Sequence, residues 1–243
     1  MKTAIIVSGV MREMDLAIPT WNIDGDFFLF VQDTFQDARR FSEQHRIIKD
    51  IEPLSDKFKA IGIVTRLPTL DKFGSTLTNQ TWKWKVAYNF LKPYIDLNGY
   101  DRFIIIRPDS FLNIRRNLNE LDIQPLTYYT TSNMFTDELG LMFANDTWIA
   151  CDLKVFEILS NFFDFVVELN GQGNIHHILA TYLQQHNIKV ADDLLLFGDS
   201  YQLRKEVRYM FEGNTLRDKY SYYDVIKEVT QWNLDDRAIY RDD

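Results

Sequence analysis

The sequence predicts an α/β fold in which a mostly parallel β-sheet carries helices on both faces. Short apolar runs recur along the chain and alternate with stretches of helical periodicity. The clearest runs end in polar residues, as expected of strands that are buried on both faces of a parallel sheet. Because no linker, repeat or low-complexity tract interrupts the sequence, we expect a single domain over 1–233 and an acidic C-terminal tail over 234–243.

Three strands are expected in the N-terminal part of the chain. Residues 4–7 form a buried run that ends at Ser8 and Gly9, and residues 27–31 form a second one. A third strand over 46–51 is a weaker expectation, because its apolar and polar residues alternate over a short length. In an open sheet of this kind, ligands bind outside the carboxyl ends of the strands.

A helix is expected after a polar cap at Thr78 or Asn79. Pro93 should end this helix, since proline lacks a backbone N–H and its ring clashes with the preceding turn. The next strand, 102–107, stops at Pro108, which cannot donate to a sheet. The helix has one apolar stripe, assigned to the core, which consists of Trp84, Ala87, Tyr88 and Leu91.

The C-terminal half continues the alternation. A β-rich segment covers 126–131, and an apolar run over 141–146 ends in an acid. A helix should begin at Asp152, a second helix covers 175–183, and a short strand follows at 188–190. The core-facing stripes are Val155, Ile158, Leu159, Phe162 and Phe163 in the first helix, and Ile175, Ile178, Leu179, Tyr182 and Leu183 in the second.

Composition narrows the class of protein. The chain is 46% apolar and 14% aromatic, which supports a sizeable core, and its net charge of −8 argues against a broad nucleic-acid-binding face. No apolar run approaches the roughly 18 residues of a membrane helix, and 4–7 is too short for a signal-peptide core. We therefore expect a cytoplasmic protein without a membrane span. The lone Cys151 cannot form an intrachain disulfide and should be a buried, inert thiol.

Several common enzyme motifs do not occur. The sequence contains no G-x-G-x-x-G after the first strand and no G-x-x-x-x-G-K, so dehydrogenase and NTPase functions lose their main support. It also lacks G-x-S-x-G, which removes the simplest hydrolase signal.

Asp109 is the first candidate for a ligand-binding residue. It follows the buried strand 102–107, so it should lie at the carboxyl edge of the sheet, where a carboxylate suits a divalent cation or the groups around a nucleotide. Two structural alternatives remain open. Asp109 either pairs with Arg107 on the surface or is an ordinary turn residue.

Four segments together resemble viral and bacterial glycosyltransferase-like proteins of the GT-A fold. Residues 5–12 are similar to an "ISGQLR" opening, and 100–109 to a "YDxVIRxRPD" segment that replaces the metal-binding Asp-x-Asp motif of other such enzymes. Residues 145–150 resemble "NDxFAxG", and 175–190 resemble "EHLLxxYLxxxxIxV". In order and approximate spacing, the resemblance covers residues 4 to about 205. It implies transfer of a sugar from a nucleotide diphosphate to an acceptor hydroxyl, and a host-cytoplasmic location for a viral protein.

The resemblance also raises the question of a metal. Where an Asp-x-Asp motif supplies two carboxylates, Arg107 and Asp109 supply one, so either Mn²⁺ or Mg²⁺ binds, or Arg107 supplies the positive charge without a metal. The late helix carries His176 where these proteins have an acid, followed by His177. Asp109 and His177 are the candidate metal ligands, the alternative being that both histidines are simply packed or solvated.

Residues near the first strands are candidates for binding the nucleotide sugar. Ser8, Gly9 and Arg12 would offer N–H groups and a guanidinium to the nucleotide or its diphosphate. Asp33 would contact the base or ribose. The alternatives are a helix-surface charge at Arg12 and a turn residue at Asp33.

Asp146 is the candidate general base. It follows an apolar run and should be partly desolvated, which makes a carboxylate a stronger base; the alternative is a helix-capping or turn acid. A carboxylate base would imply inversion at the anomeric carbon. Gln80 and Lys83 follow a polar loop and are candidates for sugar contacts, whereas Trp84 is assigned to the core.

Two questions about the function have more than one answer: which molecule accepts the sugar, and whether the protein catalyses a transfer. The acceptor is a saccharide or glycan, or a hydroxylated base of phage DNA, against which the acidic charge argues mildly. The alternative from another class is a binding module of the same fold, for nucleotides or glycans, without turnover.

Overall fold

The computed structural model describes residues 2–9, 14–32, 56–64, 76–131, 144–169 and 174–202. Its strands are β1 (Thr3–Gly9), β2 (Asp26–Gln32), β3 (Phe58–Val64), β4 (Arg102–Ile106), β5 (Ser110–Ile114), β6 (Thr127–Thr130), β7 (Trp148–Cys151), β8 (Lys189–Ala191) and β9 (Gly198–Gln202). Its helices are α1 (Met14–Ala17), α2 (Thr76–Asn98), α3 (Leu153–Glu168), α4 (Ile175–Gln185) and α5 (Leu194–Phe197), with short 3-10 turns η1 (Ile18–Thr20) and η5 (Leu118–Glu120).

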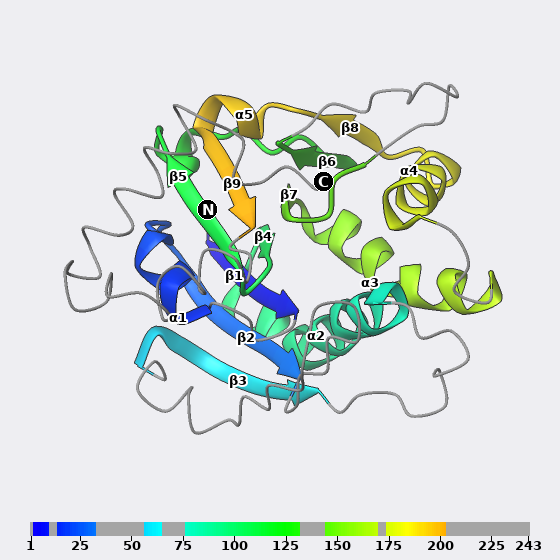
Figure 1. The fold of residues 1–243 in the computed structure, drawn as a ribbon, viewed down its shortest axis with the longest axis horizontal. Helices are drawn as coiled ribbons and strands as arrows, with labels where there is room; N and C mark the ends of the chain where they lie inside the picture. Colours follow the sequence, from blue (N-terminus) through cyan, green and yellow to red (C-terminus); the bar gives the residue numbers. More distant parts are fainter. Residues whose placement is uncertain are drawn as a thin grey trace, which may run out of the picture.

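Seven strands form one mixed sheet in the order β3-β2-β1-β4-β7-β6-β8 (Figure 1). The pairs β2–β3, β1–β2, β1–β4 and β6–β8 are parallel, whereas β7 is antiparallel to both of its neighbours, β4 and β6. Within the part of the sheet that the structure describes, β7 is therefore the one reversed strand. The predicted α/β class with a mostly parallel sheet is confirmed.

The two faces of the sheet are covered differently. The long helices α2, α3 and α4 pack on one face, where they bury the side chains of alternate strand positions. The opposite face is covered by α1, η1 and α5 together with a second, two-stranded sheet of β5 and β9. Helices therefore lie on both faces, as predicted, although those on the second face are short and share it with the two-stranded sheet.

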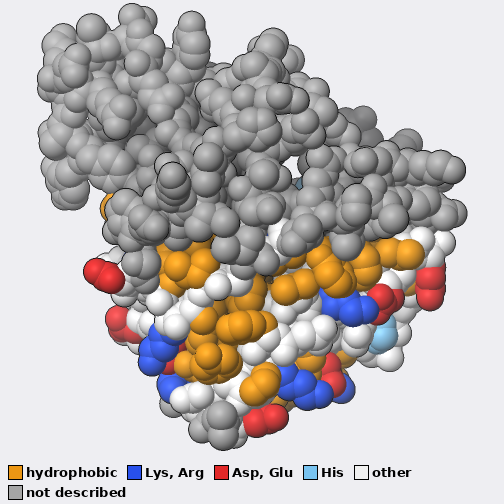
Figure 2. Space-filling view, turned by 90° about the horizontal axis from the view of Figure 1, so that it is seen from below, with side chains coloured by type: hydrophobic (Ala, Val, Ile, Leu, Met, Phe, Trp, Pro, Cys, Tyr) orange, Lys and Arg blue, Asp and Glu red, His pale blue; other side chains and the backbone are white. Residues whose placement is uncertain are grey.

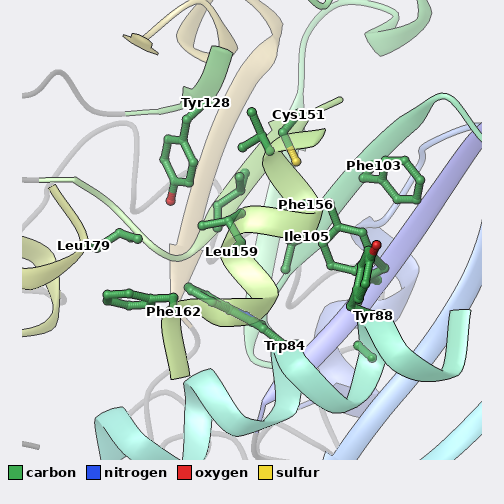
Figure 3. Close-up of a cluster of buried hydrophobic side chains, with 14 of the residues drawn as sticks. Trp84, Tyr88, Phe103, Ile105, Tyr128, Cys151, Phe156, Leu159, Phe162 and Leu179 are labelled. Atoms are coloured by element: carbon green, nitrogen blue, oxygen red, sulfur yellow. The ribbon is translucent and has the colours of Figure 1, made fainter. Parts of the chain in front are cut away.

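Aromatic side chains fill the core between the sheet and the long helices (Figure 3). The ring of Phe156 on α3 stacks on Phe103 of β4 at 5.0 Å between centroids and meets Tyr88 of α2 edge-on at 5.3 Å. Trp84, only 1% exposed, stacks on Phe162 at 6.2 Å, which confirms its assignment to the core. These contacts fix α2 and α3 against the centre of the sheet.

Two of the long helices, α3 and α4, begin where a capping residue satisfies an amide of the first turn. Asp152 caps α3 by accepting a hydrogen bond from the amide of Val155 at 2.7 Å, as the predicted start of that helix requires. Asn174 caps α4 in the same way, accepting from the amide of His176 at 2.9 Å. Both predicted helices are confirmed, and α4 extends to Gln185.

The expected end of α2 at Pro93 is wrong, because the helix continues to Asn98. Pro93 cannot donate the hydrogen bond that would reach the carbonyl of Asn89, but both residues are exposed, so water can satisfy that carbonyl. Leu91 and Ile95, on either side of the proline, are buried in the core. Packing of this apolar stripe therefore outweighs the local cost of the proline.

Other predicted boundaries differ from the structure or fall outside it. The runs at 4–7, 27–31, 102–107, 126–131 and 188–190 correspond to β1, β2, β4, β6 and β8. Residues 46–51 lie outside the described residues, as do 141–143 and the tail at 234–243. The described part of the run at 141–146 is not a strand; β7 begins two residues later, and β3, β5, β7 and β9 were not predicted as strands. The single-domain assignment stays a prediction.

Cys151 is buried in the middle of the sheet, as predicted. Its side chain is 0% exposed and forms no disulfide. Burial, with the nearby negative charge of Asp152, raises the pKa of the Cys151 thiol well above its ordinary value.

The surface mixes apolar and charged side chains. Figure 2 shows hydrophobic groups among lysines, arginines and acids on the face seen from below. Phe90 and Tyr94 of α2, each 40% exposed, stack on one another at 5.6 Å. None of the helices within the described ranges has the length and apolar character needed to cross a membrane.

Replacing Phe156 should destabilise the protein strongly. Phe156→Ala removes a fully buried ring that contacts Phe103 and Tyr88, and we expect the free energy of unfolding to fall by about 3–5 kcal/mol. Urea unfolding followed by circular dichroism measures this. Phe90→Ala, on the exposed face of α2, is the matched aromatic control and should cost much less. Equal losses from the two variants would contradict the assignment of Phe156 to the core.

Asp26, at the start of β2, should make stability depend on pH. Burial disfavours its charge, but the hydrogen bond from Tyr100 and the charges of Lys59 and Lys2 outweigh burial and lower the pKa of Asp26. A carboxyl whose pKa is lowered by folding stabilises above its unfolded pKa, and this stabilisation is lost as the pH falls through the folded pKa.

We therefore expect Asp26→Asn to lower the free energy of unfolding by about 1 kcal/mol at neutral pH, and by progressively less below about pH 4. Urea unfolding over a pH series checks this. Asp96→Asn, the same change on the exposed side of α2, is the matched control and should alter stability little at neutral pH. A difference that stayed constant down to acidic pH would contradict the electrostatic account.

Candidate functional site

The candidate site lies at the carboxyl edge of the sheet, at the ends of β1 and β4. Val7 near the end of β1 pairs with Ile106 at the end of β4, and Ile106 pairs with Trp148 at the start of the reversed strand β7. The segment that precedes β7 therefore reaches the same edge as the segment that follows β4. This is the edge at which parallel α/β sheets bind ligands.

A tight turn follows β4 at this edge. The amide of Ser110 donates to the carbonyl of Arg107 at 3.0 Å, which closes a four-residue turn with Pro108 at its second position, a favourable place for proline. The amide of Arg107 in turn donates to the carbonyl of Thr147 at 3.3 Å. Gly9 lies against this turn, because a Cβ added there would approach Pro108 Cδ to 2.6 Å. A side chain at Gly9 would therefore push the end of β1 away from the turn.

Arg107 and Asp109 form an ion pair across the turn. Arg107 Nε and Nη2 donate to the two Asp109 carboxylate oxygens at 2.9 and 2.8 Å. The predicted alternative of an Arg107–Asp109 pair is thus confirmed as a contact, but not as a surface pair, because Asp109 is only 1% exposed. Burial alone would lower the pKa of Arg107. The negative charges of Asp109 and Asp146 outweigh burial and raise this pKa above its ordinary value.

Asp146 is the second buried carboxylate at this edge, 4% exposed. Its Oδ2 accepts a hydrogen bond from Gln80 Nε2 on α2 at 2.6 Å. The alternative roles of cap and turn acid belong to its neighbours: Asn145 Oδ1 accepts from the amide of Thr147 at 2.9 Å, and Asp152 caps α3. Among the residues that the structure describes, Asp146 therefore makes no hydrogen bond to its local backbone, and its contacts are with side chains of α2 and α4.

His176, in the first turn of α4, faces Asp146. Its Nδ1 lies 3.0 Å from the carbonyl oxygen of Ala144 and 3.7 Å from Asp146 Oδ1. Since a carbonyl oxygen only accepts, Nδ1 carries the proton in this contact. His177, the histidine chosen from the sequence, accepts a hydrogen bond from Thr181 through its backbone carbonyl. The sequence signal for His176 was its position in the late helix, where the proteins that the chain resembles have an acid.

Buried hydroxyl groups also occur at this edge. Ser8 Oγ, at the end of β1, and Thr130 Oγ1, at the end of β6, are buried without a hydrogen-bond partner among the residues that the structure describes. Strand alternation puts Ser8 on the face covered by the long helices, and continuing the alternation of β4 by one residue puts Arg107 on the same face. A buried hydroxyl without a partner costs free energy, which a ligand oxygen would recover. Thr130 was not singled out from the sequence.

Three of the residues predicted to contact the nucleotide sugar are not found at this edge: one is buried in a helix, and two lie outside the described residues. Lys83 lies one turn beyond Gln80 on α2 and is 1% exposed, so its side chain is a buried part of that helix. Arg12 and Asp33 lie outside the described residues. The site therefore brings together Ser8, Gly9, Gln80, Arg107, Asp109 and Asp146, with His176 added.

The donor set at Asp109 does not fit a divalent cation. Both carboxylate oxygens already accept from a guanidinium, whose positive charge would repel Mn²⁺ or Mg²⁺. Within the described ranges, no group of three or more His, Cys, Asp or Glu side chains is arranged to hold a metal ion. The predicted Asp109–His177 metal site thus gains no support.

Substitutions at Arg107 and Asp109 should have strongly non-additive effects on the free energy of unfolding. Arg107→Gln leaves a buried carboxylate without its main counter-charge, and we expect a loss of about 3 kcal/mol in the free energy of unfolding. Asp109→Asn should cost a similar amount, and the double variant should cost less than the sum by at least about 1 kcal/mol. Urea unfolding of the four proteins measures this.

The control for this cycle is the exposed pair Lys154–Glu157 on α3, whose charged atoms are 2.7 Å apart. Lys154→Gln should change stability little, because water screens an exposed pair. Additive effects at Arg107 and Asp109 would show that the two side chains do not act as a unit.

No protein-family model matches the sequence, and no curated protein matches it either. The four-segment resemblance is therefore not supported by relatives. A functional conclusion has to come from the chemistry of the carboxyl edge.

Proposed function

We propose that the chain is a glycosyltransferase that moves a sugar from a nucleoside diphosphate sugar to an acceptor hydroxyl. One observation carries the proposal: a guanidinium, held in place by the buried Asp109, lies at the carboxyl edge beside a second buried carboxylate, Asp146. A fixed positive charge suits a diphosphate leaving group, and a nearby carboxylate suits proton abstraction.

Arg107 has donors left for an anion. Its Nε and Nη2 bind Asp109, while Nη1 has no hydrogen-bond partner among the residues described, and the side chain is 19% exposed. A guanidinium has five N–H donors, so binding one carboxylate through two of them leaves others for phosphate oxygens. Asp109 then acts as a positioning residue that orients the guanidinium.

The proposed reaction balances charge between these two groups. The acceptor oxygen attacks the anomeric carbon and forms the new C–O bond while its proton passes to Asp146. The bond from the anomeric carbon to the diphosphate oxygen breaks, and Arg107 offsets the negative charge left on the diphosphate. Asp146 Oδ2 is held by Gln80, which leaves Oδ1 for the hydroxyl. A direct displacement of this kind inverts the anomeric carbon.

The geometry favours a reaction without a divalent cation, because Arg107 occupies the position next to Asp109. Ser8 is a further candidate donor to the nucleotide, since its buried hydroxyl lacks a partner within the described part of the chain. For the acceptor, a glycan fits the net charge of −8 better than phage DNA does.

A second candidate function is a nucleotide- or glycan-binding module without turnover. The observation that favours it is that both carboxylates are already engaged by protein donors, Asp109 by Arg107 and Asp146 by Gln80. In that case the two pairs are parts of the fold, and a ligand uses only the remaining N–H and hydroxyl groups.

A thermal-shift panel of nucleoside diphosphates and nucleotide sugars, with and without Mn²⁺ or Mg²⁺, tests the proposal. A ligand at about 100 times its Kd adds about 2.7 kcal/mol to stability, which should raise the melting temperature by about 5–10 °C in a chain of this size. We expect one nucleoside diphosphate to give this shift without added metal, and Arg107→Gln to abolish it.

Turnover then separates the transferase from the binding module. With the selected donor and an acceptor panel, Asp146→Asn should lower release of nucleoside diphosphate by about 10²–10⁴-fold while leaving the thermal shift intact. Asp164→Asn, at the exposed Lys85–Asp164 pair between α2 and α3, is the control. Binding without turnover in the parent protein would support the module, and no response to any nucleotide would overturn both functions.

A further inference from the structure

A second candidate site lies at the opposite, amino edge of the sheet. There a cavity of about 460 Å³ opens between the starts of β1, β2 and β4 and the turn η5. Register places its walls side by side, since Ala4 pairs with Asp26 and Thr3 pairs with Arg102. Its volume lies in the usual range for small-molecule sites, which is roughly 300–1,000 Å³. The site described above lies at the other end of the same strands.

The charges that line this cavity balance one another. Asp26 accepts from the hydroxyl of Tyr100 and lies 3.1 Å from Lys59 Nζ and 3.5 Å from Lys2 Nζ. Arg102 is buried and donates to the carbonyls of Leu118 and Leu121 at 2.7 and 2.8 Å. An anion would meet two carboxylates here, and a cation would meet two basic side chains. The lining therefore suits an uncharged ligand.

The rim offers hydrogen-bond donors and acceptors in close pairs. Asn119 Nδ2 donates to Asp24 Oδ2 at 3.1 Å, and both side chains are exposed. Lys2, whose side chain is 42% exposed, adds an ammonium group to the same cavity. Neighbouring hydroxyl groups of a ligand can bind to such a set of groups. They donate hydrogen bonds to the carboxylate and accept them from the amide and the ammonium.

Gly25 lets the wall of the cavity lie close to the sheet. A Cβ added there would lie 2.9 Å from the carbonyl oxygen of Thr3, which is backbone and cannot turn aside. The loop at Asp24–Asp26 can therefore lie this close to β1 only with glycine at its centre.

We propose that this amino-edge cavity binds a neutral saccharide, as a second carbohydrate site separate from the carboxyl edge. Asp24 accepts hydrogen bonds from sugar hydroxyls, while Asn119 and Lys2 donate to them. For a protein that acts on glycans, such a site would hold part of a longer acceptor chain. It goes beyond the proposed transferase function and stands on its own residues.

Amide chemical shifts in ¹H–¹⁵N NMR spectra of the full chain test this inference. Titration with neutral mono- and disaccharides should shift the amides of Thr3, Gly25 and Asn119 saturably and leave those of Arg107 and Asp146 unchanged. Asp24→Asn should weaken binding by about tenfold, the factor expected for one hydrogen bond to a charged group, and Asn119→Ala by about fivefold, as expected for a hydrogen bond between neutral groups. Asp96→Asn should bind like the parent protein.

Inorganic phosphate and Mg²⁺ serve as ion probes. If either ion shifts these three amides and no saccharide does, or if neither substitution affects saccharide binding, the inference is overturned. The inference is also overturned if these amides do not respond to any saccharide. Nucleotide binding is detected at the amides of Arg107 and Asp146, so either site can fail without the other.

Discussion

The antiparallel pairing of β7 with β4 is the constraint on which the candidate site depends. Every other described strand of the main sheet runs in one direction. Because β7 is reversed, the residues before it meet the residues after β4, and the amide of Arg107 bonds to the carbonyl of Thr147. Asp146 thereby reaches the edge that holds Asp109, since it precedes a strand that runs opposite to the one that Asp109 follows.

Burial of charge at this edge has consequences for both stability and chemistry. Two carboxylates are almost fully buried, and the protein satisfies each with a donor from a different source: a turn neighbour for Asp109 and the helix α2 for Asp146. Buried charges bring little net stability but strongly penalise any arrangement that leaves them unpaired. The network therefore ties the turn after β4, the segment before β7 and α2 into one geometry, which is a condition for a preorganised site.

Sequence reasoning found the parts of the fold that periodicity encodes, and missed those set by tertiary contacts. The apolar runs of β1, β2 and β4 identified the centre of the sheet, and the capping residues Asp152 and Asn174 mark the starts of α3 and α4. Asp146 was expected at the carboxyl end of a strand, whereas it precedes a reversed one. Pairing direction is not written in a short apolar run. The contact of His176 with Asp146 was not predicted for a similar reason, since it joins residues 30 positions apart.

The position of Cys151 gives this protein a chemical reporter of its own breathing motions. Its thiol lies on β7, between β4 and β6, with none of its surface accessible, and it is the single cysteine of the chain. The side chain lies in the core between the sheet and the long helices, so a thiol-modifying reagent can react only while that core is transiently open. The rate of modification therefore measures how often this core opens, without any engineered label.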